Sequence, residues 1–263
     1  MKKKKIILLN KKFKKPITCL TAYSASIGKL LDGNVDLVLV GDSLGTTLYG
    51  MRNLQKVTLD MMISHGVSVI KNVKKSISVI DMPYKTYNNK SEALKNAKKI
   101  LNFTKAQMLK IEIKSNKLHI LKYLADNNLN IIAHIGVTPQ SFTNFHKIKA
   151  VGKKIHDSHK LIKLAKNAET AGAKAILLEC VTQQTSKKIT SELSIPTIGI
   201  GSSKYCDGQI LVFDDLINID NKIILPRFVK NYMNFSKLAK EAIKSFNKEV
   251  KNKKFPTKKY SYQ

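Results

Sequence analysis

Charged side chains stand at the ends of several short apolar runs in this sequence, where a buried strand would stop. The run LVLVG (37–41) leads directly into Asp42, and ISVI (77–80) leads into Asp81. The arrangement recurs in five successive runs, and the residues concerned are Asp42, Asp81, Lys110, Glu112, His134 and Glu179. A single member could have a local role, such as a helix cap or an Asx turn at Asp42. The recurrence favours an active site.

The residue types indicate which chemistry such a site could perform. Lys110 and Glu112 lie two positions apart, so their side chains would share one face of a strand. Oxygen ligands from two aspartates and a glutamate suit a hard cation, Mg²⁺ or Mn²⁺, whereas the sequence offers no thiolate or histidine cluster for zinc. A metal beside a lysine suits a substrate with adjacent carboxylate and keto oxygens. Glu179 could then remove a proton α to the carbonyl, so the pattern predicts metal-assisted enolisation of a 2-oxo acid.

The elements that would position these residues alternate along the chain. Short apolar runs predict eight strands, at 17–23, 36–41, 77–83, 108–113, 130–136, 175–180, 197–202 and 209–215. Amphipathic segments between and after them predict helices at 58–73, 91–104 (with Ser91 as a plausible N-cap), 116–127, 158–170, 182–192 and 228–249.

Eight strands alternating with helices in this length of chain predict an α/β fold, a closed (β/α)8 TIM barrel. A doubly wound open sheet is the alternative, since periodicity alone does not separate the two. No glycine-rich GxGxxG follows the first strand, which counts against a dinucleotide-binding fold. No linker stands out, so the 263 residues are expected to form one domain with a short basic N-terminal arm and a frayed basic tail at 251–263.

The formal charge of +29 raises the possibility of nucleic-acid binding. Only Arg52 and Arg227 among the 47 basic residues are arginine, the residue best suited to bidentate phosphate and base contacts. The lysines are scattered along the whole chain, and abundant lysine, asparagine and isoleucine fit a drift toward A/T-rich codons. We therefore expect no nucleic-acid partner.

The location predicted from the sequence is cytoplasmic. No apolar run approaches the ~20 residues of a membrane span, so no membrane association is expected. The apolar part of MKKKKIILLNKK is only four residues long, short of the ~7–15 of a signal peptide. Cys19, Cys180 and Cys206 have no CxxC spacing, which fits a reducing compartment.

Several separated stretches, in order along the chain, resemble the ketopantoate hydroxymethyltransferase family. They span about residues 18–232 and are LTAY, LVGDSLG, DMPY, KIE, HIGVTPQS, LLEC, and PTIGIG followed by DGQILV. The resemblance implies a barrel of the phosphoenolpyruvate/pyruvate superfamily type, assembled as a homodecamer of two stacked pentamers. It also implies transfer of a one-carbon unit from 5,10-methylenetetrahydrofolate to 3-methyl-2-oxobutanoate, giving 2-dehydropantoate in pantothenate synthesis.

The resemblance further implies a role for each matching residue. Asp42 and Asp81 would ligate Mg²⁺, with Glu112 in the coordination sphere, directly or through water. The 2-oxo acid would contact Asp42, Ser43, Asp81 and Lys110, with a supporting polar role for His134. Glu179 would be the catalytic base that takes the proton from C3. The sequence does not indicate which residues would contact the folate.

Three departures from the family pattern affect loops rather than these residues. Ser24 replaces an acidic residue after TAY, NFHKIKAVGK (144–153) lacks the usual glycines, and Ser202-Ser203 replaces Ala-Gly. One alternative function is a Mg²⁺-dependent lyase or mutase of the same superfamily, which would need no folate. Another is a basic RNA- or membrane-associating protein without catalysis, which would bind polyanions with steep salt dependence.

Overall fold

The computed structural model describes residues 15–143, 149–220 and 225–262. The chain divides into two compact units, Met1–Val212 and Phe213–Gln263. In the first unit eight parallel strands form a closed barrel in sequence order, with β1 paired to both β2 and β8. The strands are β1 (Ile17–Thr21), β2 (Leu37–Val40), β3 (Ile77–Asp81), β4 (Met108–Glu112), β5 (Ile131–Gly136), β6 (Ala175–Glu179), β7 (Thr197–Ile200) and β8 (Gly208–Leu211).

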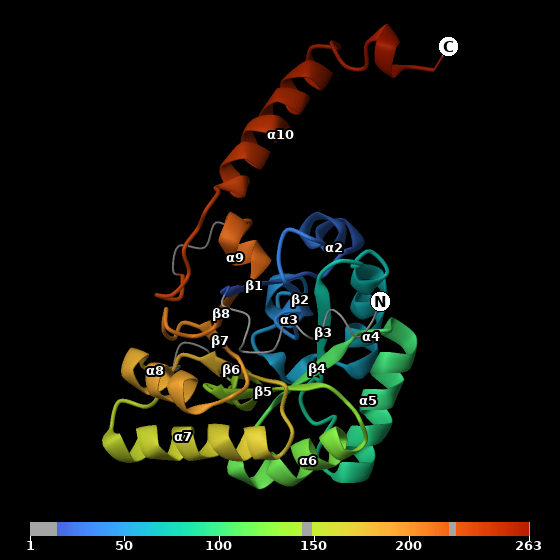
Figure 1. Cartoon of the computed structure of the whole chain (residues 1–263). Helices are drawn as coiled ribbons and strands as arrows, with labels where there is room; N and C mark the ends of the chain where they lie inside the picture. The colour runs from blue at the N-terminus through green and yellow to red at the C-terminus, as the bar shows by residue number, and fades with distance from the viewer. Residues whose placement is uncertain (1–14, 144–148, 221–224, 263) are drawn as a thin grey trace. The chain divides into compact units, whose positions relative to one another are not determined.

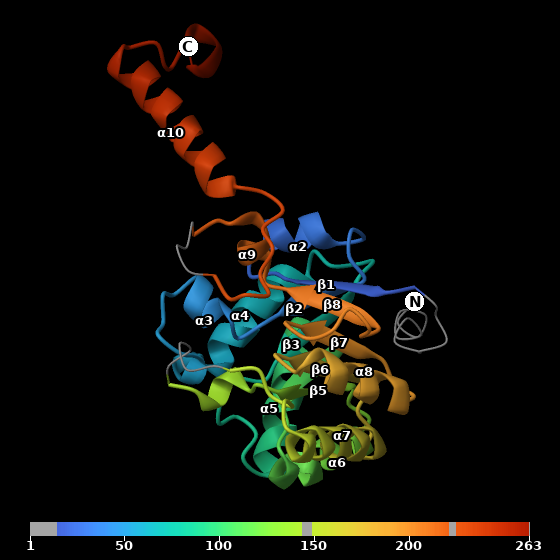
Figure 2. The same ribbon diagram turned by 90° about the vertical axis from the view of Figure 1, so that its left-hand side faces the viewer.

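Helices follow the strands and lie outside the barrel (Figures 1 and 2). They are α2 (Ala25–Leu31), α3 (Leu44–Thr47), α4 (Leu59–Ile70), α5 (Lys90–Thr104), α6 (Leu118–Asp126), α7 (Ile155–Thr170) and α8 (Gln183–Glu192). Short 3-10 turns lie in the loops at η2 (Leu54–Lys56), η3 (Ser115–Lys117) and η4 (Pro139–Ser141). This arrangement is the closed barrel predicted from the sequence, and the doubly wound alternative is wrong.

Alternate strand residues fill the barrel interior, as close packing of a TIM barrel requires. One buried cluster takes side chains from all eight strands, including Leu37 and Leu39, Ile77 and Val79, and Leu177. Side chains in a strand alternate between its two faces. The residue two positions after an inward-facing apolar residue therefore also points into the barrel, closer to the carboxyl end of the strand. The apolar packing therefore sets the direction in which the charged residues at the strand ends point.

The eight predicted strands are all present, whereas several predicted boundaries and caps differ. The strand predicted over 209–215 ends at Leu211, and Phe213 begins a helix with two aspartates in its first turn. Carboxylates in a first turn favour helix because they face its partly positive end. The N-cap of α5 is Asn89 rather than Ser91, because Asn89 Oδ1 accepts a hydrogen bond from the backbone N–H of Glu92 at 2.9 Å.

The second unit contains α9 (Phe213–Ile217), α10 (Phe235–Lys251) and the short turn η6 (Lys258–Tyr260). The helix predicted from residue 228 begins at Phe235, where the Asn234 side chain accepts from the Lys237 backbone N–H at 3.1 Å. The single-domain organisation and the frayed tail stay predictions. Among the described residues, no helix has the length and apolar character needed to cross a membrane.

Candidate active site at the carboxyl ends of the strands

The structure gathers the predicted site residues at one end of the barrel. Strand pairing places Asp81 beside Lys110, Glu112 beside His134, and Gly136 beside Glu179. Asp81, Lys110, Glu112 and His134 are all buried, and the Glu179 side chain is 17% exposed. The sequence-based grouping of these residues is therefore reproduced in three dimensions.

Asp81 and Lys110 form a buried ion pair between β3 and β4. Lys110 Nζ lies 2.9 Å from Asp81 Oδ1, although no described residue makes an aligned hydrogen bond to that oxygen. Burial, reinforced by Asp42 and opposed by Lys110, raises the pKa of Asp81 to about 7. Burial alone would lower the pKa of Lys110, but the carboxylates of Asp81, Asp42 and Glu112 outweigh it and raise that pKa. Lys110 is thus a cation among more carboxylates than it can neutralise.

His134 links the Lys110 ammonium to Glu179. Lys110 Nζ lies 3.3 Å from His134 Nδ1, and His134 Nε2 lies 3.2 Å from Glu179 Oε2. Burial, followed by the charge of Lys110, lowers the pKa of His134 below its ordinary value, so the ring is neutral at pH 7. An ammonium group only donates, so Nδ1 must accept and the single ring proton is on Nε2. His134 therefore presents an N–H toward the Glu179 carboxylate.

Asp42 does not cap the following helix. The N-cap of α3 is Ser43, and its side chain makes no capping hydrogen bond. The Asp42 backbone N–H instead donates to Asp81 Oδ2 at 3.0 Å, which ties the β2 and β3 ends together. The Ser43 hydroxyl shares a hydrogen bond of 2.7 Å with the Tyr23 hydroxyl. Asp42 is thus directed to the carboxylate cluster rather than to local helix structure.

Two residues in this site were missed by the sequence analysis, Gln140 and Tyr87. The Gln140 side chain donates to Asp42 Oδ2 at 2.6 Å, and its backbone N–H donates to Glu112 Oε1 at 3.0 Å. The Tyr87 hydroxyl donates to Gln140 Oε1 at 2.6 Å. Gln140 lies in the TPQS part of a stretch that carries the family resemblance, which was the available signal. Burial and the charge of Glu112 raise the pKa of Tyr87 well above its usual value, so this hydroxyl keeps its proton.

The donor set fits a hard divalent cation bound partly through water. Asp42, Asp81 and Glu112 each have one carboxylate oxygen bonded to an N–H of the protein. The other oxygen of Asp42 and of Glu112 can face a ligand, whereas Asp81 Oδ1 lies beside Lys110 Nζ and a cation there would have to share it. Within the described ranges, no three His, Cys, Asp or Glu side chains stand close enough to hold a metal by themselves. Mg²⁺ is commonly held by one or two carboxylates, with waters and substrate completing the octahedron. Two carboxylates with Glu112 acting through water would satisfy that requirement.

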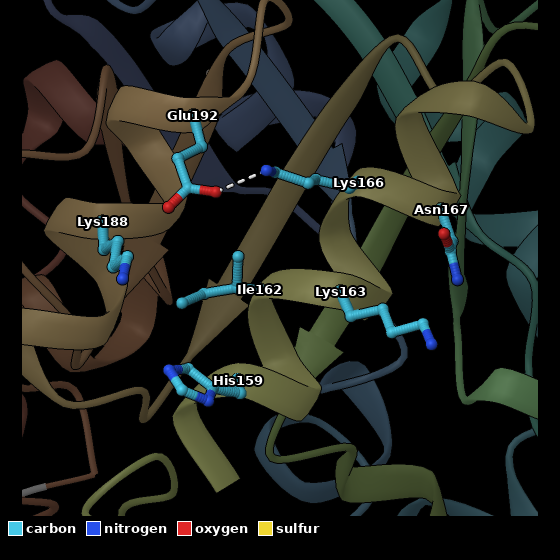
Figure 3. Close-up of a pocket in the computed structure, with 7 residues that line it drawn as sticks. All are labelled: His159, Ile162, Lys163, Lys166, Asn167, Lys188 and Glu192. Carbon is cyan, nitrogen blue, oxygen red and sulfur yellow. Dashed lines mark ion pairs between the residues drawn. The ribbon is translucent and has the colours of Figure 1, made fainter. Parts of the chain in front are cut away.

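A separate pocket of about 320 Å³ lies on the outside of the barrel between α7 and α8 (Figure 3). Lys166 and Glu192 form an ion pair of 2.6 Å across it. None of the strand-end residues lines this pocket. Its lining residues are His159, Ile162, Lys163, Lys166, Asn167, Lys188 and Glu192. This pocket has no part in the arrangement described above.

Comparison with solved structures shows the fold. Phosphonopyruvate hydrolase matches with a TM-score of 0.64 at 11% identity, covering 98% of this chain and 92% of that chain. The same enzyme in complex with oxalate and Mg²⁺ matches with a TM-score of 0.60 at 12% identity, covering 99% and 93%. A 2,3-dimethylmalate lyase, described as a PEP mutase/isocitrate lyase superfamily member, has a TM-score of 0.62 at 11% identity, covering 95% of each chain.

Sequence comparison adds the family. The model of the family described as Ketopantoate hydroxymethyltransferase matches residues 3–258. A 3-methyl-2-oxobutanoate hydroxymethyltransferase of Pelagibacter ubique (strain HTCC1062) is 48% identical over 262 residues, covering 100% of both chains. The protein of the same name from Rhizobium etli is 38% identical over 250 residues, covering 95% of this chain and 91% of its own. Together with the barrel and its buried carboxylate cluster, these matches show that the chain belongs to the ketopantoate hydroxymethyltransferase family.

Proposed function

We propose that this chain transfers the one-carbon unit of 5,10-methylenetetrahydrofolate to C3 of 3-methyl-2-oxobutanoate, giving 2-dehydropantoate for pantothenate synthesis. The observation that carries the proposal is the line from Asp81 through Lys110 and His134 to Glu179 at the strand ends. It combines a cationic centre for a 2-oxo acid with a carboxylate that can act as a base. Family membership and the names of the relatives support the specific reaction.

Asp42 and Asp81 would hold the metal, with Glu112 in its coordination sphere, directly or through water. Bound Mg²⁺ would act as a Lewis acid that polarises the keto group, and its positive charge would offset the negative charge of the substrate carboxylate. Three buried carboxylates facing one lysine support this assignment, because ionised groups in an apolar interior need compensating charge. Burial, and after it the neighbouring charge of Asp42, raises the pKa of Asp81 despite the opposing charge of Lys110.

The 2-oxo acid would lie against Asp42, Ser43, Asp81 and Lys110. The Ser43 hydroxyl or backbone N–H would donate to the substrate carboxylate, and the Lys110 ammonium would face the oxygen that becomes negative. Fixed charge beside a developing oxyanion gives a large share of catalytic stabilisation in a site that excludes water. Lys110 is buried and already ordered by Asp81, so it needs no reorganisation during the step.

Glu179 would be the general base. Its carboxylate takes the proton from C3, and the electron pair of the C–H bond moves toward the keto oxygen. C3 then bonds to the methylene carbon of the folate as one of its two C–N bonds breaks. The oxygen of one water replaces the remaining folate nitrogen on that carbon and becomes the hydroxyl of the product. The proton from C3 and one proton of the water go to the two nitrogens, and the folate leaves as tetrahydrofolate. The neutral His134 ring would orient Glu179 through Nε2, which lies 3.2 Å from Glu179 Oε2 but makes no aligned hydrogen bond to any described residue in this structure. This arrangement leaves Glu179 Oε1 for the proton.

A second candidate is a Mg²⁺-dependent lyase or mutase acting on a 2-oxo acid. The likeness in fold to phosphonopyruvate hydrolase and 2,3-dimethylmalate lyase is the observation in its favour. Both candidates require the same enolisation, and only the transferase requires folate. A cytoplasmic location and a homodecamer belong to the proposal as expectations, and light scattering on the purified chain tests the latter.

Proton NMR of 3-methyl-2-oxobutanoate in D₂O, with protein and Mg²⁺, tests the function. We expect exchange at C3 that depends on Mg²⁺, and a 2-dehydropantoate signal once tetrahydrofolate and formaldehyde are added. Exchange without product under the complete conditions would favour the lyase or mutase. If C3 does not exchange with Mg²⁺ alone or with Mg²⁺, tetrahydrofolate and formaldehyde together, the proposed role of the strand-end carboxylates is wrong.

A further inference from the structure

Gln140 connects the ends of several strands around the carboxylate cluster. It lies in the turn η4 after β5 and is 2% exposed. Its Nε2 donates to Asp42 Oδ2 at 2.6 Å, beyond β2, and to the Met82 carbonyl at 3.0 Å, beyond β3. Its Oε1 accepts from the Tyr87 hydroxyl at 2.6 Å. All the polar groups of this amide are therefore used.

The orientation of the amide follows from its partners. The Met82 carbonyl can only accept a hydrogen bond, so the NH₂ group must face it, and the same group then faces Asp42 Oδ2. Gln140 Oε1 must then face Tyr87, whose hydroxyl is the donor. The Tyr87 oxygen is left to accept from the Glu112 backbone N–H, which lies 3.3 Å away. A directed chain of hydrogen bonds thus runs from Glu112 through Tyr87 and Gln140 to Asp42.

The backbone of Gln140 adds a second connection to the same cluster. Its N–H donates to Glu112 Oε1 at 3.0 Å, so one residue bonds to two of the three carboxylates. Each bond occupies one particular oxygen, Oδ2 of Asp42 and Oε1 of Glu112. The oxygens that remain for a ligand are Asp42 Oδ1 and Glu112 Oε2. Gln140 therefore determines which oxygen each carboxylate can present.

We propose that Gln140, held by Tyr87, is the positioning residue of the divalent-metal site, setting the orientation of Asp42 and Glu112 from the loop after β5. The inference rests on the metal site of the proposed function and extends it to residues outside the coordination sphere. Partners that orient metal ligands typically contribute about 10- to 100-fold in metal affinity. A buried amide with fixed orientation is suited to this task because it cannot turn without losing hydrogen bonds to both sides.

The test is the affinity of the full chain for Mg²⁺ alone by titration calorimetry, with the EPR line shape of bound Mn²⁺ as a spectroscopic readout. We expect Gln140→Leu to weaken Mg²⁺ binding about 10- to 100-fold and to broaden the Mn²⁺ signal. Tyr87→Phe should weaken binding less, because the amide stays in place and only loses its anchor. The double variant should bind no more weakly than Gln140→Leu, since both changes act through the same amide.

Ser141→Ala is the matched control, since it alters the same turn. The Ser141 hydroxyl is exposed and accepts from Lys114 Nζ at 3.0 Å, away from the carboxylates, so wild-type Mg²⁺ affinity is expected. If Gln140→Leu does not fold, Tyr87→Phe carries the test. A folded Gln140→Leu or Tyr87→Phe with unchanged Mg²⁺ affinity and Mn²⁺ signal would overturn the positioning role. A wild-type chain that binds no Mg²⁺ would instead overturn the metal site of the proposed function, and the positioning role with it.

Discussion

His134 Nε2 lies 3.2 Å from Glu179 Oε2, between the ends of the neighbouring strands β5 and β6. The ring is neutral and its single proton is on Nε2, because the Lys110 ammonium on the other side can only donate to Nδ1. Glu179 therefore has one oxygen facing an N–H and the other available to a substrate. The pair separates the task of orienting the base from the task of accepting the proton.

Removing the charge of Glu179 should stop the first chemical step. We expect Glu179→Gln to lower the rate of C3 proton exchange in 3-methyl-2-oxobutanoate by about 10²- to 10⁴-fold, the usual contribution of a positioned base. Keto-acid binding should remain, since the metal ligands and Lys110 are unchanged. Exchange is measured by NMR in D₂O and binding by calorimetry with Mg²⁺. Wild-type exchange in this variant would remove Glu179 from the role of base.

Replacing His134 should slow the same step without preventing binding. His134 Nε2 lies close to Glu179 Oε2, and a displaced general base slows proton transfer, so we expect His134→Gln to lower kcat by about tenfold. KM for the keto acid should change little, because His134 acts through Glu179. His159→Gln, on α7 outside the barrel, is the matched control and should have wild-type kinetics. A large rise in KM at constant kcat would instead place His134 in substrate binding.

The raised pKa of Asp81 predicts how the stability of the metal-free protein depends on pH. A carboxyl with a pKa of about 7 when folded and about 3.9 when unfolded holds its proton longer in the native state. Its contribution to stability is therefore full below about pH 4 and is lost as the pH rises through about 7, by at most about 1.4 kcal/mol per pH unit. Other groups titrate as well, so the effect of Asp81 is obtained from the difference in the free energy of unfolding between wild type and a variant that lacks this carboxyl.

Asp81→Asn supplies that difference because it cannot titrate. In EDTA, the free energy of unfolding of the variant minus that of wild type should increase from about pH 4 to pH 7 and then level off. Urea denaturation at a series of pH values measures it. A pH-independent difference would mean that Asp81 has an ordinary pKa in the folded protein.

The strands and most of the site were predictable because both depend on local patterns. Near-continuous apolar runs are typical of parallel strands buried on both faces, and β3 and β4 are buried at every position. A charge at the end of such a run is conspicuous, which identified Asp81, Lys110 and Glu112. Because the carboxyl ends of the strands of a barrel meet at one end of it, these residues could be predicted to lie together even though the loop structures were not predicted.

Gln140 and Tyr87 were not predictable in the same way. Glutamine and tyrosine are common at protein surfaces, and nothing local indicates that these two are buried. The bond from Gln140 to Asp42 joins residues 98 positions apart, so it exists only because the barrel closes. Helix α2 was missed for another reason, since its seven residues are too short to display a helical period and contain Gly28.

Gly136 provides a test of how closely the backbone packs beside the base. It has a φ of +104°, and an added Cβ would collide with the Glu179 carbonyl oxygen and lie 2.7 Å from Val181 Cγ2. We expect Gly136→Ala to lower the free energy of unfolding by about 1–3 kcal/mol from overpacking, in addition to backbone strain. It should also slow C3 exchange, because the collision displaces the strand end that carries Glu179. Chemical denaturation and the NMR assay measure the two effects.

Substitution of Gly50 provides a control that distinguishes backbone strain from steric collision in Gly136→Ala. Its φ is +60°, and an added Cβ would meet nothing within 4 Å. Gly50→Ala should therefore show only the cost of a left-handed alanine, about 1–2 kcal/mol, with wild-type exchange at C3. If the two variants lose equal stability and exchange equally well, the contact between Gly136 and the Glu179 backbone is not needed to hold the base. A larger loss in Gly136→Ala with slowed exchange indicates that the close β5–β6 packing sets the position of Glu179.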